Sequence, residues 1–189
     1  MADLKTIQAR LKAELRRVQD RRDSGRLGEI LVEDWLRADE RLEVQPLPQD
    51  IGDKRLLLRE GGKRPDFAVA FRSDGECFFV DAKLHATDGL QQFALDLSEI
   101  AEFRSAMRQL EITSLLIALV PREQVDKLFL ITLDDIEAKN EFGPPGTFKL
   151  DPTDALRLFG PFTREAYDLA LRRFHAEGYT GEVPPYPES

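Results

Sequence analysis

Cysteine and histidine are scarce in this chain of 189 residues, which contains one Cys and two His. A single cysteine, Cys77, argues against a disulfide-stabilised scaffold. Cys77 lies in an expected strand, so we predict a buried, inert thiol of a protein in the reducing cytoplasm. The two histidines and Cys77 cannot build a zinc site of ordinary spacing.

Long apolar runs and phosphate-binding loops are also missing. No apolar segment is long enough to span a bilayer, and the charged N-terminal stretch lacks the pattern of a signal peptide. We therefore expect a cytoplasmic protein that does not enter a membrane. The chain shows no internal repeat and no glycine-rich phosphate loop, and its length fits about one domain with a substantial core.

A net positive charge, common among nucleic-acid-binding proteins, is absent. The chain has 27 Lys and Arg against 35 Asp and Glu, a net charge of −8. The charge is unevenly spread, however, because residues 1–26 carry a net +4 and the remainder a net −12. Local patches rather than net charge attract phosphates. The acidic balance therefore lowers the expectation of tight, sequence-independent duplex binding without excluding a nucleic-acid partner.

Two neighbouring segments have the composition of strands. Residues 66–71 and 76–81 are rich in β-branched and aromatic residues, and Asp74-Gly75 lies between them. An Asp-Gly pair between two such runs is a strong hairpin signal, because a tight turn requires a positive φ. The pattern predicts an antiparallel hairpin.

The hairpin gathers charged residues at one end. A two-residue loop at 74–75 places Asp66 opposite Lys83, whereas a loop at 73–74 places Asp66 opposite Asp81. Side chains alternate between the two faces of a strand, so both registers put Asp66, Asp81 and Lys83 on one face. Two acids and a lysine are therefore expected to lie together.

Helices are expected to cover both faces of this hairpin. The face opposite the acids is apolar, and we predict that it is buried in the core. It carries Phe67, Val69, Phe71, Phe78 and Val80. The acid-bearing face is also partly apolar, because it carries Ala68, Ala70 and Phe79. A strand that is apolar on both faces is typical of a sheet buried on both sides.

A third acid precedes the sheet. The apolar residues of 27–38 form one broad arc at helical spacing, and Glu29 lies at the rim of that arc. A rim position lets its carboxylate reach over the sheet edge, whereas Glu33 is expected to point further towards solvent. Glu29 also follows Ser24-Gly25 in what we predict to be a first helical turn, where the helix dipole favours an acid regardless of function. Both explanations of Glu29 remain open.

These residues carry a resemblance to a known superfamily. Gly28-Glu29, Pro65-Asp66 and Asp81-Ala82-Lys83, in an αβββαβ-like order, resemble the PD-(D/E)xK nucleases, which include archaeal-type Holliday junction resolvases and many restriction endonucleases. The resemblance covers about residues 24–137. It implies an α/β fold with a restriction-endonuclease-like αβββαβ core, in which a mixed sheet has helices on both faces.

The resemblance also implies roles for individual residues. Asp66 and Asp81 would bind Mg²⁺, for which Mn²⁺ would substitute, and the carbonyl of Ala82 would add a ligand. Lys83 would orient or activate the attacking water, and Glu29 would complete or support the metal site. The chemistry is consistent with these residue types, because Mg²⁺ prefers oxygen ligands and keeps several waters. A cation beside the attacked phosphate stabilises the developing negative charge.

Further residues are candidates for contact with nucleic acid. A basic group leads directly into Asp66 and comprises Lys54, Arg55, Arg59, Lys63 and Arg64. Of these, Lys63 and Arg64 are nearest to the acids. Gln91 and Gln92 fall in the first turn of a helix predicted over 87–110, where they could contact phosphate or order a water. Both could equally be ordinary exposed glutamines, and His85 could likewise be an ordinary residue at a strand end.

The leading hypothesis is a Mg²⁺-dependent endonuclease, with DNA favoured over RNA as its substrate. One alternative is a nucleic-acid-binding or assembly subunit that retains the fold without useful catalysis. A second alternative is a structural α/β interaction protein in which the acids coincide by chance. Specific metal binding would separate the last of these from the other two.

The remaining sequence divides into four parts. Residues 1–23 are predicted to be an amphipathic helix, 24–142 the nuclease core, 143–178 a C-terminal helical appendage and 179–189 a proline-rich tail. The narrow apolar stripe of the first helix could be a homodimer seam or could pack on its own domain; it comprises Leu4, Ile7, Leu11, Leu15 and Val18.

Beyond the hairpin, further elements are expected within the core and appendage. Residues 42–47 and 55–59 are the candidates for the first strand of the sheet and for a lead-in to the Asp66 strand. Residues 112–120 and 128–133 are predicted as later strands, followed by a short helix that opens at 134–136. Thr163 is expected to cap the main C-terminal helix and Gly178 to end it. The tail from Tyr179 is expected to be extended or disordered.

Overall fold

The structure, a computed structural model, describes residues 4–47, 63–85, 92–95, 97–111, 113–140, 147–149 and 162–188. Its helices are α1 (Leu4–Arg37), α3 (Leu97–Gln109), α4 (Leu133–Asn140) and α5 (Arg164–Ala176). Its strands are β1 (Leu42–Pro46), β2 (Phe67–Phe71), β3 (Cys77–His85), β4 (Gln92–Ala94), β5 (Leu115–Pro121), β6 (Phe129–Thr132) and β7 (Thr147–Lys149). The prediction for residues 55–59 and the start of the predicted appendage, residues 143–146, lie outside the described residues.

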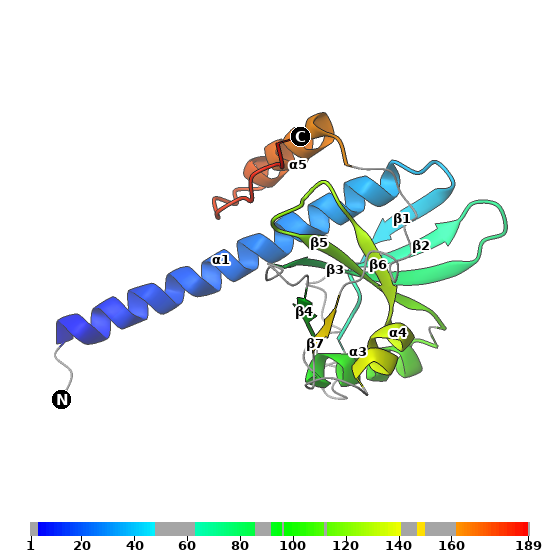
Figure 1. Cartoon of the computed structure of the whole chain (residues 1–189), viewed down its shortest axis with the longest axis horizontal. Helices are drawn as coiled ribbons and strands as arrows, with labels where there is room; N and C mark the ends of the chain where they lie inside the picture. Colours follow the sequence, from blue (N-terminus) through cyan, green and yellow to red (C-terminus); the bar gives the residue numbers. More distant parts are fainter. Residues whose placement is uncertain are drawn as a thin grey trace.

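Five strands form a mixed sheet in the order β1-β2-β3-β5-β6 (Figure 1). The β1–β2, β2–β3 and β5–β6 pairs are antiparallel, whereas β3 and β5 are parallel. Helix α3 lies in the crossover from β3 to β5. The expected α/β class and mixed sheet are therefore confirmed. A separate two-stranded sheet joins β4 to β7.

The predicted hairpin forms in the second of its two registers. Ala68 pairs with Phe79, which places Asp66 level with Asp81 rather than with Lys83. The connection is longer than two residues, because Phe71 N donates to Glu76 O at 2.9 Å across residues 72–75. Gly75 adopts a φ of +74°, the conformation for which a glycine was expected in this turn.

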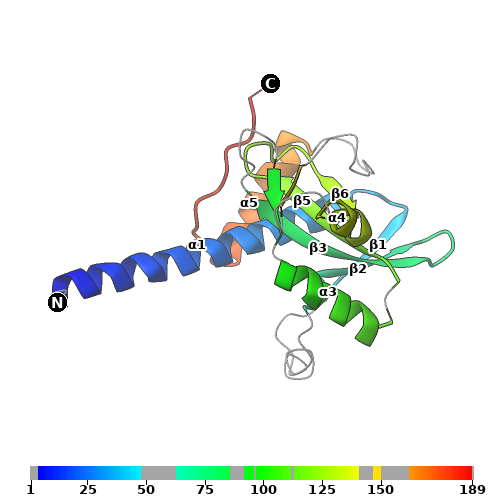
Figure 2. The same ribbon diagram turned by 60° about the horizontal axis from the view of Figure 1, so that its bottom comes forward.

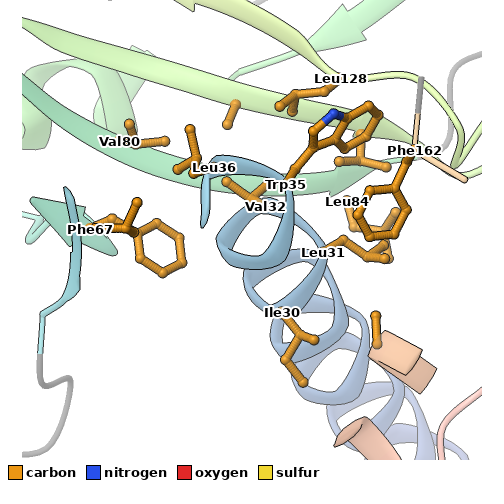
Figure 3. Packing of buried hydrophobic residues seen from close by; sticks show 14 of the residues in the cluster. Ile30, Leu31, Val32, Trp35, Leu36, Phe67, Val80, Leu84, Leu128 and Phe162 are labelled. Carbon is orange, nitrogen blue, oxygen red and sulfur yellow. The ribbon is translucent and has the colours of Figure 1, made fainter. Parts of the chain in front are cut away.

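Apolar residues cover both faces of the sheet, as expected. One cluster lies between the sheet and helices α1 and α5, where the rings of Trp35 and Phe162 pack at a tilt with centroids 4.9 Å apart (Figure 3). The other lies between the sheet and helices α3 and α4, and includes Phe103 and Ile136. The ribbon view shows α3 and α4 at the bottom of the molecule, away from α1 and α5 (Figure 1).

Helix α1 is longer than predicted, because the two expected helices are one continuous helix. Ser24 and Gly25 lie inside it, and the predicted boundary between residues 23 and 24 coincides with no break. An interior glycine destabilises a helix by only about 1 kcal/mol, which packing of the following turns against the sheet can outweigh. Glu29 therefore lies in mid-helix, so the helix dipole does not explain it. The N-terminal half of α1 projects away from the body (Figure 2).

Three other predictions are wrong. The helix predicted over 87–110 is interrupted by a strand, because Gln92–Ala94 pair with β7 as β4, and α3 is Leu97–Gln109; residues 87–91 of the prediction lie outside the described residues. Cys77 is exposed rather than buried, since it lies at the turn end of β3 beyond the core. Glu33 is 4% exposed rather than solvated, because α5 packs over it and Arg173 pairs with it at 2.6 Å.

The C-terminal helix has the predicted ends. The Thr163 hydroxyl accepts from Ala166 N at 3.2 Å, and Gly178 follows the last turn with a φ of +87°. The tail is extended as expected, but it is docked and not disordered. Tyr167 donates to the carbonyl of Pro184, and Tyr186 donates to Phe162 O at 2.7 Å. Among the described residues, no helix is both long and apolar enough to cross a membrane.

Candidate active site

Asp81 lies on the central strand β3, next to β5, and only 1% of it is exposed. Its Oδ2 atom lies 2.6 Å from Lys83 Nζ, two residues further along the same face. Its Oδ1 atom is buried and has no hydrogen-bond partner among the residues that the structure describes. A buried carboxylate oxygen without a partner is costly, and it indicates a position where a water or a cation completes the site.

Asp66 immediately precedes β2 and faces the same stretch of β3. Its backbone N–H donates to Val80 O at 3.0 Å, and its Oδ2 accepts from Ala82 N at 2.7 Å. Burial first, and then the negative charge of Asp81, raise the pKa of Asp66 to about 8 against the opposing effect of the Ala82 N–H. When both are ionised, the two carboxylates therefore repel each other inside the protein.

Lys83 is held between two carboxylates. Its Nζ lies 2.6 Å from Asp81 Oδ2 and 2.7 Å from Glu99 Oε1. Glu99 comes from the first turn of α3 and also binds Lys63, whose Nζ lies 3.7 Å from Asp81 Oδ2. Both lysines also lie over the ring of Phe103, at 4.9 Å for Lys63 and 5.6 Å for Lys83.

Burial and the two neighbouring carboxylates determine the charge of Lys83. Burial lowers its pKa, but the charges of Asp81 and Glu99 outweigh burial and raise the pKa above its ordinary value. Burial likewise raises the pKa of Glu99, and Lys83 and Lys63 outweigh that effect and lower it. At neutral pH Lys83 is therefore a cation, suited to stabilise negative charge and not to accept a proton.

Glu29 lies near Asp66 but is engaged with an arginine. Its Oε2 lies 2.8 Å from Arg26 Nη1, and Arg26 is bound on its other side by Glu177 at 2.7 Å. The negative charge of Glu29 also contributes to the raised pKa of Asp66. Glu29 is therefore close enough to affect the pKa of Asp66, while its own carboxylate is paired with Arg26.

Two cavities meet at this region, one on each side of α1. The first, which we call the Asp66 cavity, has a volume of about 640 Å³, and its lining includes Glu29, Asp66 and Tyr179. The second, which we call the Arg122 cavity, has a volume of about 820 Å³, and its lining includes Ala82, Lys83 and Arg122. Both are also lined by Arg21 and Gly25.

The four residues predicted to contact nucleic acid have different outcomes. Lys63 joins the Glu99 and Asp81 cluster, and Arg64 is half-buried beside it in the chain. Gln91 lies outside the described residues. Gln92 is in β4 opposite Lys149 rather than in a first helical turn, so the expected position at the start of a helix is wrong for Gln92.

Of the carboxylates predicted to bind a metal, Asp66 and Asp81 fit a divalent cation, whereas Glu29 fits it less well. Among the described residues, no group of three or more His, Cys, Asp or Glu lies close enough to hold a metal. Asp66 and Asp81 nevertheless combine mutual repulsion with a buried, unpartnered oxygen. Mg²⁺ needs only one or two carboxylates because it keeps several waters. The pair therefore fits Mg²⁺, whereas the carboxylate of Glu29 is already bound by Arg26.

Sequence reasoning missed two residues of this region, Glu99 and Arg122. Glu99 is separated from Lys83 by sixteen positions, and only the packing of α3 on the sheet brings them together. An acid in the first turn of an amphipathic helix gave a weak signal, since the helix dipole also favours it. Arg122 follows β5 in a turn, where the sequence offered no signal.

Comparison of the chain with protein-family models, with curated proteins and with solved structures gave no match to any of them. The assignment of a function therefore depends on the site itself.

Proposed function

We propose that the protein is a Mg²⁺-dependent endonuclease of the PD-(D/E)xK type that hydrolyses phosphodiester bonds in DNA. The observation that carries this proposal is the pair of acids on adjacent strands with a lysine beside them. Asp66 and Asp81 lie level in the hairpin, Asp81 Oδ1 is buried without a partner among the described residues, and Lys83 lies 2.6 Å from Asp81 Oδ2.

The order of elements supports the proposal. Helix α1, strands β1 to β3, helix α3 and strand β5 come in the order α, β, β, β, α, β once β4, which lies between β3 and α3 but belongs to the separate two-stranded sheet, is set aside. The candidate residues lie at the corresponding places, with Glu29 on the helix and the two acids on the second and third strands, or next to them. This order is the one that a restriction-endonuclease-like core requires.

Asp66 and Asp81 would hold the cation, and the Ala82 carbonyl would be a further oxygen ligand. Bound Mg²⁺ would neutralise the phosphate and lower the pKa of its bound water. The remaining steps belong to the protein's own side chains. Protonated Lys83 would stabilise the negative charge that develops on the attacked phosphate. Glu99 and Lys63 would hold the Lys83 ammonium in place, since Glu99 binds both lysines.

A panel of labelled DNA substrates tests the proposal. Wild-type protein with Mg²⁺ should cleave at least one of plasmid, linear duplex, branched and single-stranded DNA. Lys83→Ala should abolish most of that cleavage, whereas Arg172→Gln, which changes an exposed residue on α5, should retain it. Equal cleavage by Lys83→Ala and wild type would place the activity elsewhere or in a contaminant.

One observation favours a second candidate, a nucleic-acid-binding or assembly subunit without useful catalysis. Lys83 is bound by both Asp81 and Glu99, which leaves Asp81 Oδ2 in an ion pair instead of open to a cation. The same panel separates the candidates. A binding subunit would retain DNA in an electrophoretic mobility assay and leave every substrate intact.

A further inference from the structure

The Arg122 cavity is more positively charged than the Asp66 cavity. Four cationic side chains line it, namely Arg16, Arg21, Lys83 and Arg122, against the single acid Asp20. The Asp66 cavity is lined by three arginines and three acids. The two cavities therefore differ in electrostatic character although they share Arg21 and Gly25.

Arg122 is fixed in place by neutral groups. Its backbone N–H donates to His85 O at 2.9 Å. Its guanidinium donates to Ser24 Oγ at 3.2 Å and to the carbonyl of Glu182 at 3.4 Å. Within the described part of the chain, no carboxylate forms an ion pair with Arg122, whereas Arg26 in the other cavity binds both Glu29 and Glu177. The positive charge of Arg122 is thus held rigidly without a neutralising partner among these residues.

The candidate catalytic residues connect the two cavities. Asp66 lines the Asp66 cavity and Ala82 lines the Arg122 cavity, and the two are joined by the 2.7 Å bond from Ala82 N to Asp66 Oδ2. On the α1 side the cavities adjoin at Gly25, where an added Cβ would meet no atom within 4 Å. The surface at Gly25 is consequently low and open between the two cavities.

We propose that the Arg122 cavity binds the phosphodiester backbone of single-stranded DNA next to the candidate cleavage site, so that the strand crosses α1 at Gly25. This inference rests on the proposed function for the identity of its ligand. Arg16, Arg21 and Arg122 contact phosphates that flank the one held at the acids. Arginine recognises phosphate through paired N–H donors.

A single strand fits this path better than a duplex. The walls of the Asp66 cavity come from the ends of β1 and β2, and those of the Arg122 cavity from the end of β3 and the turn after β5. A ligand that fills both cavities has to cross α1 at the residues that the two cavities share, Arg21 and Gly25, and follow the helix surface into each of them. Double-helical DNA is stiff over about 150 base pairs, whereas a single strand bends readily.

Binding of a short fluorescein-labelled single-stranded DNA in EDTA tests the inference without cleavage. The double variant Arg16→Gln/Arg21→Gln should raise the Kd about tenfold or more. It should also reduce the salt dependence of log Kd by about 0.7 for each phosphate that the variant no longer neutralises. The matched control Arg108→Gln/Arg172→Gln removes the same charge from exposed positions on α3 and α5 and should shift the Kd by less than about twofold.

Gly25 supplies a second test that removes no charge. Gly25→Leu should fold at least as stably as wild type, because the space around an added Cβ is open and leucine favours helix. Its Kd for the single strand should nevertheless rise about tenfold, and Gly25→Ala should give a smaller rise in the same direction.

Several outcomes would overturn the inference. Equal rises in Kd for the two double variants would show that only net charge matters. An unchanged Kd in Gly25→Leu, or tighter wild-type binding of a duplex of the same sequence, would exclude the single-strand path. These results concern binding in EDTA, so they are separate from the proposed function, whose failure would appear as absent cleavage by wild type with Mg²⁺.

Discussion

At the scale of single residues, the site is governed by buried charge. Asp66 and Asp81 repel each other across adjacent strands, and Lys83 and Lys63 offset only part of that repulsion. In these surroundings Asp66 holds a proton that a solvated carboxylate would lose, because its pKa is raised. The stability of the metal-free protein should therefore depend on pH through Asp66.

The free energy of unfolding should fall as pH rises through the weakly acidic and neutral range. The folded pKa of Asp66 is raised from 3.8 to about 8, so the folded state binds a proton that the unfolded state has lost. Stability is thus lost between these two pKa values, and the full loss remains above both. Asp66→Asn keeps an acceptor for Ala82 N and removes the titration, so urea unfolding in EDTA should show a flatter pH profile. An unchanged profile in Asp66→Asn would refute this role.

Removing the charge of Asp81 should weaken metal binding without lowering the stability of the metal-free protein. Lys83 keeps Glu99 as a partner at 2.7 Å, and Asp66 loses its repulsive neighbour. We therefore expect Asp81→Asn to melt at or above the wild-type temperature in EDTA. With Mg²⁺ or Mn²⁺ at about a hundred times its Kd, wild type should gain about 2.7 kcal/mol and Asp81→Asn much less.

The opposite result is equally informative. A clear loss of stability for Asp81→Asn in EDTA, combined with no metal-dependent gain in wild type, would falsify the shared cation site. Asp81 and Lys83 would then form a structural ion pair, since breaking a buried pair by removing one partner costs about 3–5 kcal/mol. Differential scanning calorimetry with and without metal distinguishes the two.

At the scale of elements, the position of α1 on the sheet decides where Glu29 and the two cavities lie. The helix crosses β3 at Gly28, where an added Cβ would lie 2.9 Å from Leu84 Cβ and 3.1 Å from Leu84 N. Such a contact with backbone cannot be relieved by rotating a side chain. The glycine thus permits a close approach of helix and strand that positions the candidate site.

Gly28→Ala should therefore destabilise the protein, by about 1–3 kcal/mol, because the helix must move away from β3. Gly25→Ala is the matched control in the same helix, and it should be neutral or stabilising by up to about 1 kcal/mol, since its added Cβ meets nothing within 4 Å. Urea unfolding measures both. Similar effects of the two substitutions would indicate that helix propensity alone is at work.

The same scale shows what local patterns could not predict. The helix from Leu97 was predicted to start ten residues earlier, at Thr87, because its apolar spacing continues into residues that form β4. Pairing of β4 with β7 joins residues more than fifty positions apart and outweighs a local helical preference. Glu33 was misjudged for a similar reason, since its partner Arg173 lies on α5.

At the scale of the whole molecule, the N-terminal half of α1 stands away from the body (Figure 1). Leu15 on this segment is 63% exposed, and the side chains of Leu4, Ile7, Leu11 and Val18 lie outside the described residues. Whether the stripe joins two copies thus stays a prediction. Two active sites related by a two-fold axis would suit cleavage of two strands.

Light scattering on point variants tests this assembly. If the stripe is a dimer seam, wild type should have twice the mass of the chain, and Leu15→Glu should reduce it to that of one chain because a carboxylate cannot be buried in an apolar seam without large cost. Leu169→Glu is the control, since Leu169 on α5 is similarly exposed at 58%. An unchanged mass in Leu15→Glu would rule the seam out.

The sequence by itself determined the hairpin, the shared face of Asp66, Asp81 and Lys83, and the ends of α5. These features depend on neighbouring residues, because side-chain alternation, turn residues and helix caps act over a few positions. Only the tertiary structure decided the hairpin register, the continuity of α1, and the meeting of Glu99 and Lys63 with Lys83. Contacts of this kind join distant segments, and their energies arise only when helices and sheet pack together.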